Sequence, residues 1–191
     1  MTTLDLSGNP VCNAKHGAQI GKVLANNTHL KQLILDGTLQ DGDGATEIAN
    51  ALRKNKTLEL LSMEKNDLSP EGIKAIAEAL IDNTSLTELR LRDQKKPCGI
   101  EVEKAFMPSL EKNEVLIKLS FVFKDNGVRN YVNRCITRNT EKGLLLTEFF
   151  HFPRGTALIT TSSDVISSPE QGGGSPRGQE EWPCHDCHPA V

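Results

Sequence analysis

Apolar residues recur along this chain in the phrase Leu-x-x-Asn-x-x-Leu. Full copies span Leu24–Leu30, Leu52–Leu58, Leu80–Leu86 and Leu110–Leu116, and a partial copy follows at Ile136–Asn139. Each full copy leads into a Leu-x-x-Leu-x-Leu stretch or a close variant of it, and a first such stretch stands at Met1, Leu4 and Leu6. These five stretches follow each other at steps of 29, 28, 28 and 30 residues. Such a period is typical of leucine-rich repeats, whose units bury their apolar faces only by stacking on neighbours.

Helical and strand periodicities follow each other within one repeat, for which Ser69–Leu91 is a clear example. Ser69 can cap free amides at a helix start, and the helix that follows is expected to close at Asn83. Its apolar stripe falls at spacings of three and four residues, at Ile73, Ile76, Ala77 and Leu80. Leu89 and Leu91 then alternate with polar residues, as in a strand with one buried face.

The repeated unit therefore predicts an α/β fold. We expect a right-handed leucine-rich-repeat solenoid of about five repeats, of the ribonuclease-inhibitor-like subclass. A parallel sheet would line the concave face, and the helices would cover the convex face.

The chain is expected to divide at Gly143. Residues 1–142 would form the repeat domain, and residues 143–191 a C-terminal extension. Within the extension, residues 144–150 (Leu-Leu-Leu-Thr-Glu-Phe-Phe) read as an edge strand. The remainder, rich in Gly, Ser and Pro, is predicted to be a disordered tail.

The charge is unevenly distributed along the chain, although its net value is only −3. Residues 1–85 carry 8 Lys and Arg against 11 Asp and Glu, whereas residues 86–142 carry 12 against 8. A basic end of this kind suits an acidic partner surface. The cations are too dispersed, and too poor in accompanying aromatic residues, to indicate nucleic acid. No signal segment or membrane-length apolar stretch is visible, so we expect a cytoplasmic protein without membrane contact.

Candidate chemistry is sparse. The terminal Cys184-His185-Asp186-Cys187-His188 spells the C-x-x-C-H haem-attachment pattern and could equally supply zinc ligands. It follows a Pro-, Gly- and Ser-rich segment without an export signal, so we assign no metal and no cofactor. The five cysteines do not resemble a disulfide framework. No partnered nucleophile, phosphate-binding loop or carboxylate pair is visible, so the sequence predicts a protein that is not an enzyme.

Several irregular stretches are more specific than the repeats themselves. They are Asn26–Leu30, Leu35–Thr38, Met63–Asn66, Ala79–Leu86 and, above all, Leu91–Glu103 with its Asp-Gln-Lys-Lys-Pro-Cys-Gly loop. Through these stretches, residues from about Ile20 to Asn139 resemble the C-terminal leucine-rich-repeat domain of the tropomodulin and leiomodin family.

The resemblance implies a function in the actin cytoskeleton. Tropomodulins cap the pointed ends of actin filaments and so control filament length, and leiomodins use the related domain to nucleate filaments. The implied partner is actin, at a filament pointed end or as a monomer, and we expect the chain itself to be a monomer. Tropomyosin binding is not expected, because Met1 already falls inside the first repeat and the family's N-terminal half has no counterpart.

Two alternatives remain open at this stage. One is a generic leucine-rich-repeat interaction scaffold of the immune or GTPase-regulating type. The other, an enzyme or haem carrier, rests on the terminal Cys/His cluster alone.

The basic end is the candidate actin contact, because actin is acidic on much of its surface. The competing interpretation is an ordinary solvated face. The candidate residues are Arg90, Arg92, Lys95, Lys96, Lys118, Lys124, Arg129, Arg134 and Arg138.

Overall fold

Strands and helices alternate along the part of the chain that the computed structural model describes, which is residues 2–9, 14–38 and 42–150. In order they are β1 (Thr3–Asp5), α1 (Ala14–Leu24), β2 (Gln32–Ile34), α2 (Gly42–Lys54), β3 (Leu60–Ser62), α3 (Pro70–Ala79), β4 (Glu88–Arg90), α4 (Ile100–Lys112), β5 (Lys118–Ser120) and α5 (Asn126–Phe150). The chain divides into two units, Met1–Phe152 and Pro153–Val191. All described residues belong to the first.

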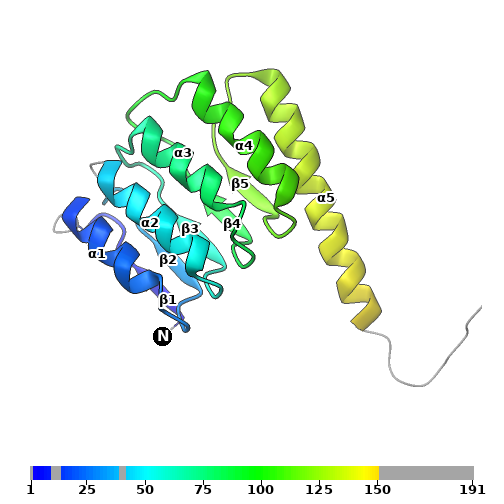
Figure 1. Cartoon of the computed structure of the whole chain (residues 1–191), viewed down its shortest axis with the longest axis horizontal. Helices are drawn as coiled ribbons and strands as arrows, with labels where there is room; N and C mark the ends of the chain where they lie inside the picture. The colour runs from blue at the N-terminus through cyan, green and yellow to red at the C-terminus, as the bar shows by residue number, and fades with distance from the viewer. Residues whose placement is uncertain (1, 10–13, 39–41, 151–191) are drawn as a thin grey trace, which may run out of the picture. The chain divides into compact units, whose positions relative to one another are not determined.

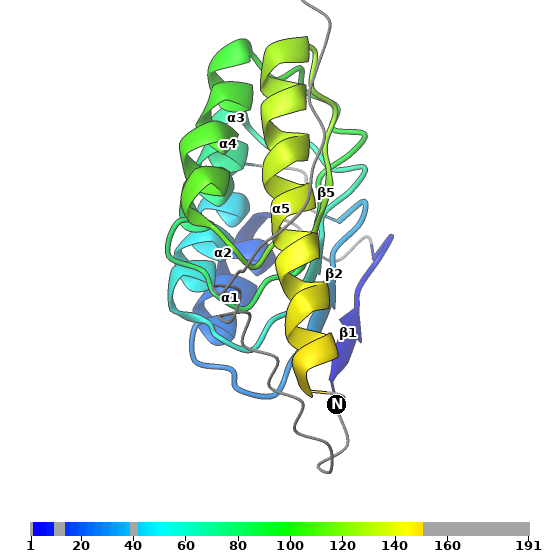
Figure 2. The ribbon, with the colours of Figure 1, turned by 90° about the vertical axis from the view of Figure 1, so that its right-hand side faces the viewer.

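The strands form one parallel sheet in the order β1-β2-β3-β4-β5, so that neighbours in the sheet are also neighbours in the sequence. Its register aligns the repeats, since Leu33 pairs with Leu61, Leu61 with Leu89, and Leu89 with Leu119. Helices α1 to α4 lie side by side in the same order (Figure 1). The view turned by 90° shows these helices as one layer and the strands as another (Figure 2). The predicted leucine-rich-repeat solenoid is confirmed.

The core lies between the two layers. The predicted stripe of α3, from Ile73 to Leu80, is fully buried, as are the strand centres Leu33, Leu61 and Leu89. Leu119 is only partly buried, because β5 is the last strand of the sheet. The hydroxyl of Ser69 accepts a hydrogen bond from the amide of Gly72 at 3.0 Å, which confirms the predicted cap.

A left-handed turn follows each of the first four strands. It is occupied by Gly8, Gly37, Lys65 and Asp93, whose φ angles are 63°, 66°, 55° and 59°. Glycine adopts this conformation at no steric cost, whereas lysine and aspartate do so at some expense. The turn thus recurs with the repeat, even though glycine is kept only in the first two copies.

An asparagine ladder joins successive repeats at the helix-to-strand turns. Its members are the recurring asparagines Asn27, Asn55, Asn83, Asn113 and Asn139. The side-chain amide of Asn83, for example, donates to the carbonyls of Leu52 (2.7 Å) and Asn55 (3.2 Å) in the previous repeat. Its side-chain oxygen accepts from two amides of its own turn, those of Ser85 and Leu86. Asn55, Asn83 and Asn113 therefore each satisfy backbone groups of two repeats at once.

The expected edge strand at residues 144–150 is wrong, because α5 continues as a helix to Phe150. Leucine is a strong helix former, and a single glycine costs about 1 kcal/mol in a helix interior, so Gly143 does not end it. The expected boundary at residues 142/143 thus falls inside α5. The expected disordered tail and the terminal Cys/His cluster lie outside the described residues.

Candidate functional site

The nine predicted contact residues are spread over the last two strands, the loops that follow them, and the last helix. Arg90 lies on β4 and Lys118 on β5; Arg92, Lys95 and Lys96 lie between β4 and α4; Lys124 lies between β5 and α5; Arg129, Arg134 and Arg138 lie on α5. They fall into two groups: those whose side chains have a partner among the described residues, and those whose side chains form no ion pair there.

Arg90 and Lys118 share one carboxylate on the sheet. The Nε atom of Arg90 and the Nζ atom of Lys118 both donate to Oε1 of Glu88, Lys118 at 2.9 Å. Burial opposes the ionisation of Glu88, but the hydrogen bonds from Lys118 and Arg90 outweigh it, and the pKa of this carboxyl is lowered. The same bond to Glu88 raises the pKa of Arg90. Both cations are therefore partly neutralised before any partner arrives.

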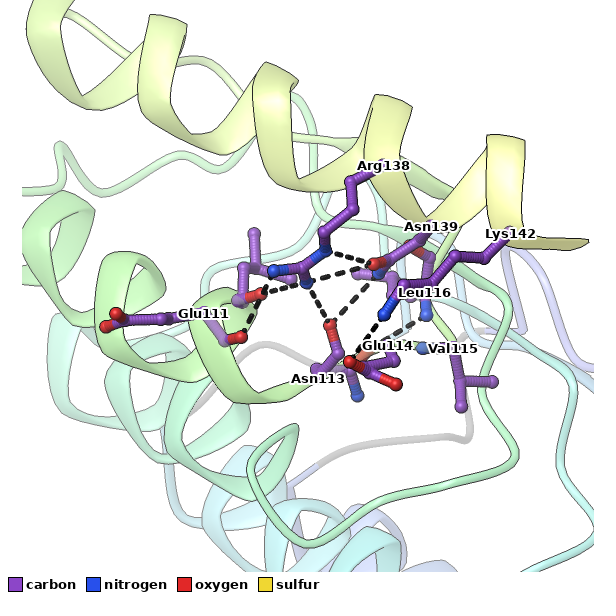
Figure 3. Close-up of polar contacts among 9 residues, drawn as sticks. Glu111, Asn113, Glu114, Val115, Leu116, Arg138, Asn139 and Lys142 are labelled. Atoms are coloured by element: carbon purple, nitrogen blue, oxygen red, sulfur yellow. Dashed lines mark hydrogen bonds and ion pairs between the residues drawn. The ribbon is translucent and has the colours of Figure 1, made fainter. Parts of the chain in front are cut away.

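Arg138 closes the C-terminal end of α4 (Figure 3). Its guanidinium donates to the carbonyl oxygens of Leu110 (2.9 Å), Glu111 (3.3 Å) and Asn113 (2.9 Å), all of them at or just beyond the end of that helix. It also contacts the ladder residue Asn139 through that side chain's oxygen. A cation at a helix C-terminus is stabilised by the helix dipole, so Arg138 has a clear structural role.

Three further candidates have weaker partners. Lys96 lies 3.8 Å from the carboxylate of Asp67, and Arg129 donates to the carbonyl of Phe123. Arg134 lies over the ring of Tyr131, 5.6 Å from its centroid. The exposed contacts of Lys96 and Arg134 contribute at most about 1 kcal/mol, so they leave these two side chains available to a partner. The hydrogen bond of Arg129 is part-buried and holds its side chain more firmly.

The remaining candidates are Arg92, Lys95 and Lys124. In the part of the chain that the structure describes, none of these three exposed side chains forms an ion pair. All three lie in the loops that follow β4 and β5.

A buried carboxylate that sequence reasoning missed supports the loop after β5. Glu103 on α4 is only 2% exposed. Its two oxygens accept hydrogen bonds from the backbone amides of Lys124 (3.1 Å) and Asp125 (3.0 Å), just before α5 begins. Nothing in the repeat pattern marks Glu103, because its partners lie 21 and 22 residues away in the next turn of the solenoid.

Neither metal-binding nor membrane-spanning features are found among the described residues. No group of three or more His, Cys, Asp or Glu side chains there is arranged to hold a metal ion. Of the described cysteines, Cys98 and Cys135 are free thiols, and burial raises the pKa of Cys98, with Glu103 adding to the effect. None of the described helices combines the length and apolar character needed to cross a bilayer.

The fold and its surface define a leucine-rich-repeat protein. The description of the family model that matches residues 5–142 is the TMOD/LMOD leucine-rich domain, and the chain belongs to that family. The resemblance predicted from the irregular stretches is thereby confirmed.

The relatives found in sequence include leiomodins and a tropomodulin. Leiomodin-1 of Mus musculus is 32% identical over 142 residues, which cover 74% of this chain and 24% of the relative. Leiomodin-2 of Gallus gallus is 35% identical over 124 residues, or 65% of this chain and 22% of the relative. Tropomodulin-4 of Bos taurus is 30% identical over 123 residues, or 64% and 36%. The chain thus spans about a quarter to a third of the length of these relatives.

Two solved structures share the architecture. One, titled Leiomodin-1 Actin-Binding Site 2, is 31% identical with a TM-score of 0.72, and the match covers 78% of this chain and 87% of that one. The other is the tropomodulin C-terminal domain of Caenorhabditis elegans, 20% identical with a TM-score of 0.73 over 78% of this chain and 90% of that one. The second likeness concerns the fold alone.

Proposed function

We propose that this chain binds actin through its leucine-rich-repeat domain and contributes to pointed-end capping and filament-length control. The proposal rests on the likeness to the leiomodin-1 structure, whose title names it an actin-binding site and of which this chain covers 87%. Family membership from residue 5 to residue 142 supports it. The proposed place of action is the actin cytoskeleton of the cytoplasm, and the proposed activity is binding rather than catalysis.

The generic scaffold of the immune or GTPase-regulating type is the weaker alternative. The relatives described above are leiomodins and tropomodulins, which gives a cytoskeletal partner priority.

We further propose that the actin contact lies among the nine basic residues at the C-terminal end of the repeats. The ion pairs that these residues form within the domain decide which of them are most readily tested by substitution. Lys95 has no ion pair among the described residues, and Lys96 has only a long contact to Asp67. Both can therefore be changed at little cost to folding, since an exposed ion pair contributes about 0–1 kcal/mol.

Charge reversal tests this contact. The double variant Lys95→Glu, Lys96→Glu is expected to bind filamentous actin at least about tenfold more weakly in co-sedimentation, because two favourable charges become repulsive. The matched control is Lys74→Glu, Lys104→Glu, which changes the same net charge at exposed positions of α3 and α4. Equal binding by wild type and the Lys95/Lys96 variant would refute a contact through these two residues, and no binding by wild type would refute the proposed function.

A further inference from the structure

An exposed valine lies between two hollows at the basic end of the domain. Val122, in the loop between β5 and α5, is 56% exposed. It lines a hollow of about 240 Å³ together with Lys96, Pro97 and Lys124. It also lines a second hollow, of about 320 Å³, together with Arg92 and Arg129. A large apolar side chain is thus presented to solvent beside two hollows, each of which is lined by two cations.

The charge around Val122 is predominantly positive. Arg92 and Lys124 form no ion pair within the described residues, and Lys96 is only 3.8 Å from its partner Asp67. Of the acids that line the two hollows, Asp93 is exposed, but Glu103 is buried beneath the loop. The oxygens of Glu103 accept hydrogen bonds from the backbone amides of Lys124 and Asp125, so they are already occupied within the domain.

The loops that present these side chains are held in place. The Gln94 side chain donates to the carbonyl of Met63 at 2.8 Å and accepts from the amide of Leu68 at 3.3 Å. Asp125 accepts from the amide of Val128 at 2.8 Å, at the start of α5. Binding at a surface that is already ordered loses less conformational entropy than binding by a mobile loop.

We infer that this surface, defined by Arg92, Lys96, Val122 and Lys124, binds an acidic segment of actin that carries an apolar side chain. The apolar side chain would pack on Val122, and carboxylates on either side of it would meet Arg92 in one hollow and Lys124 in the other. Charge complementarity favours this occupant over a basic or purely apolar one. The inference rests on the proposed function and names the part of the domain that makes the contact.

Two kinds of variant test it, with filamentous actin as the probe and the full chain as the binder. Val122→Asp places a negative charge at the centre of the surface, and Arg92→Glu, Lys124→Glu reverses the two flanking cations. Each is expected to weaken actin binding at least tenfold, and the salt dependence of binding should become shallower in the charge-reversed variant. The controls are Ile117→Asp, at a residue that is 44% exposed and lines neither hollow, and Lys74→Glu, Lys104→Glu.

The outcomes separate the inference from the proposed function. If wild type binds actin and both variants bind within twofold of it, the inference is overturned and actin binding stands. If wild type does not bind, both fall. Far-ultraviolet circular dichroism checks the fold of each variant; if Val122→Asp does not fold, the charge-reversed pair alone decides, because both its side chains are exposed.

Discussion

Replacing Arg138 by alanine separates its structural role from a role in binding. The guanidinium bonds three carbonyl oxygens, those of Leu110, Glu111 and Asn113, and also the side-chain oxygen of Asn139. A hydrogen bond that involves a charged group contributes about 1.5–3 kcal/mol net. Since Arg138 is partly exposed and its bonds act together, we expect Arg138→Ala to lower the free energy of unfolding by about 2–3 kcal/mol.

A thermal melt followed by circular dichroism measures this loss. For a domain of this size, 1 kcal/mol corresponds to about 2–4 °C, so the midpoint should fall by about 4–12 °C. Arg138→Lys should recover little, because one ammonium cannot reproduce the planar fork that spans these oxygens. The matched control is Arg134→Ala, four residues earlier on α5, which loses the contact over Tyr131. That contact contributes about 0.5–1 kcal/mol at an exposed site.

Two results would refute this reasoning. One is a midpoint for Arg138→Ala within about 1 °C of wild type. The other is an equal loss for Arg134→Ala. If the Arg138→Ala variant were as stable as wild type but did not bind actin, Arg138 would be an actin contact rather than a cap on α4.

Three further predictions concern the core, the ladder and the ion cluster on the sheet. Leu89→Ala, at a fully buried strand centre, should cost about 2–5 kcal/mol in urea denaturation, and a loss below 1 kcal/mol would contradict its inward position. Asn83→Ala leaves two carbonyls and two amides without their partner and should lower the free energy of unfolding by about 3 kcal/mol. Asn27→Ala should lower it less, because among the described residues the Asn27 side chain bonds only amides of its own turn. The pKa of Glu88 is lowered, so this carboxyl loses its proton more readily in the folded protein than in the unfolded chain. Its contribution to stability should be present above its ordinary value of 4.5 and be lost as the pH falls through the lower folded pKa. Glu88→Gln should therefore flatten that part of the acid denaturation profile, and an unchanged profile would count against the ion cluster.

The repeat architecture could be predicted because its signal is local and recurs. Leu33, Leu61 and Leu89 each stand in the same short context, and stacking puts them in register along the sheet. The cap at Ser69 was predictable for the same reason, since the group that it bonds lies only three residues away.

The asparagine ladder was visible as a pattern but not as an interaction. Asn83 was expected only to close its helix. Helix α3 instead ends at Ala79, and the side-chain amide of Asn83 bonds carbonyls 28 and 31 residues earlier. Those partners become evident only when the stacking of the repeats is known. The prediction of a strand at residues 144–150 was wrong for a different reason. A short apolar run is compatible with either a strand or a helix, and Gly143 suggested a helix end, whereas α5 continues through it.

The nine basic residues could be counted in the sequence but not sorted. Whether a cation is paired depends on which acid the register places beside it, and β4 and β5 align Glu88 with Lys118. The partners of Arg138 could not be predicted either, because the carbonyls to which it donates belong to the preceding repeat.

Pointed-end elongation of actin tests the central claim most directly. Pyrene-labelled actin is grown from filaments whose barbed ends are blocked, so that all growth occurs at pointed ends, and the chain is added over a range of concentrations. If the chain caps pointed ends, the elongation rate falls as the chain is added, and Lys95→Glu, Lys96→Glu requires a higher concentration for the same effect. Elongation that is unchanged at every concentration, together with no co-sedimentation of the folded chain with filaments, would contradict the central claim.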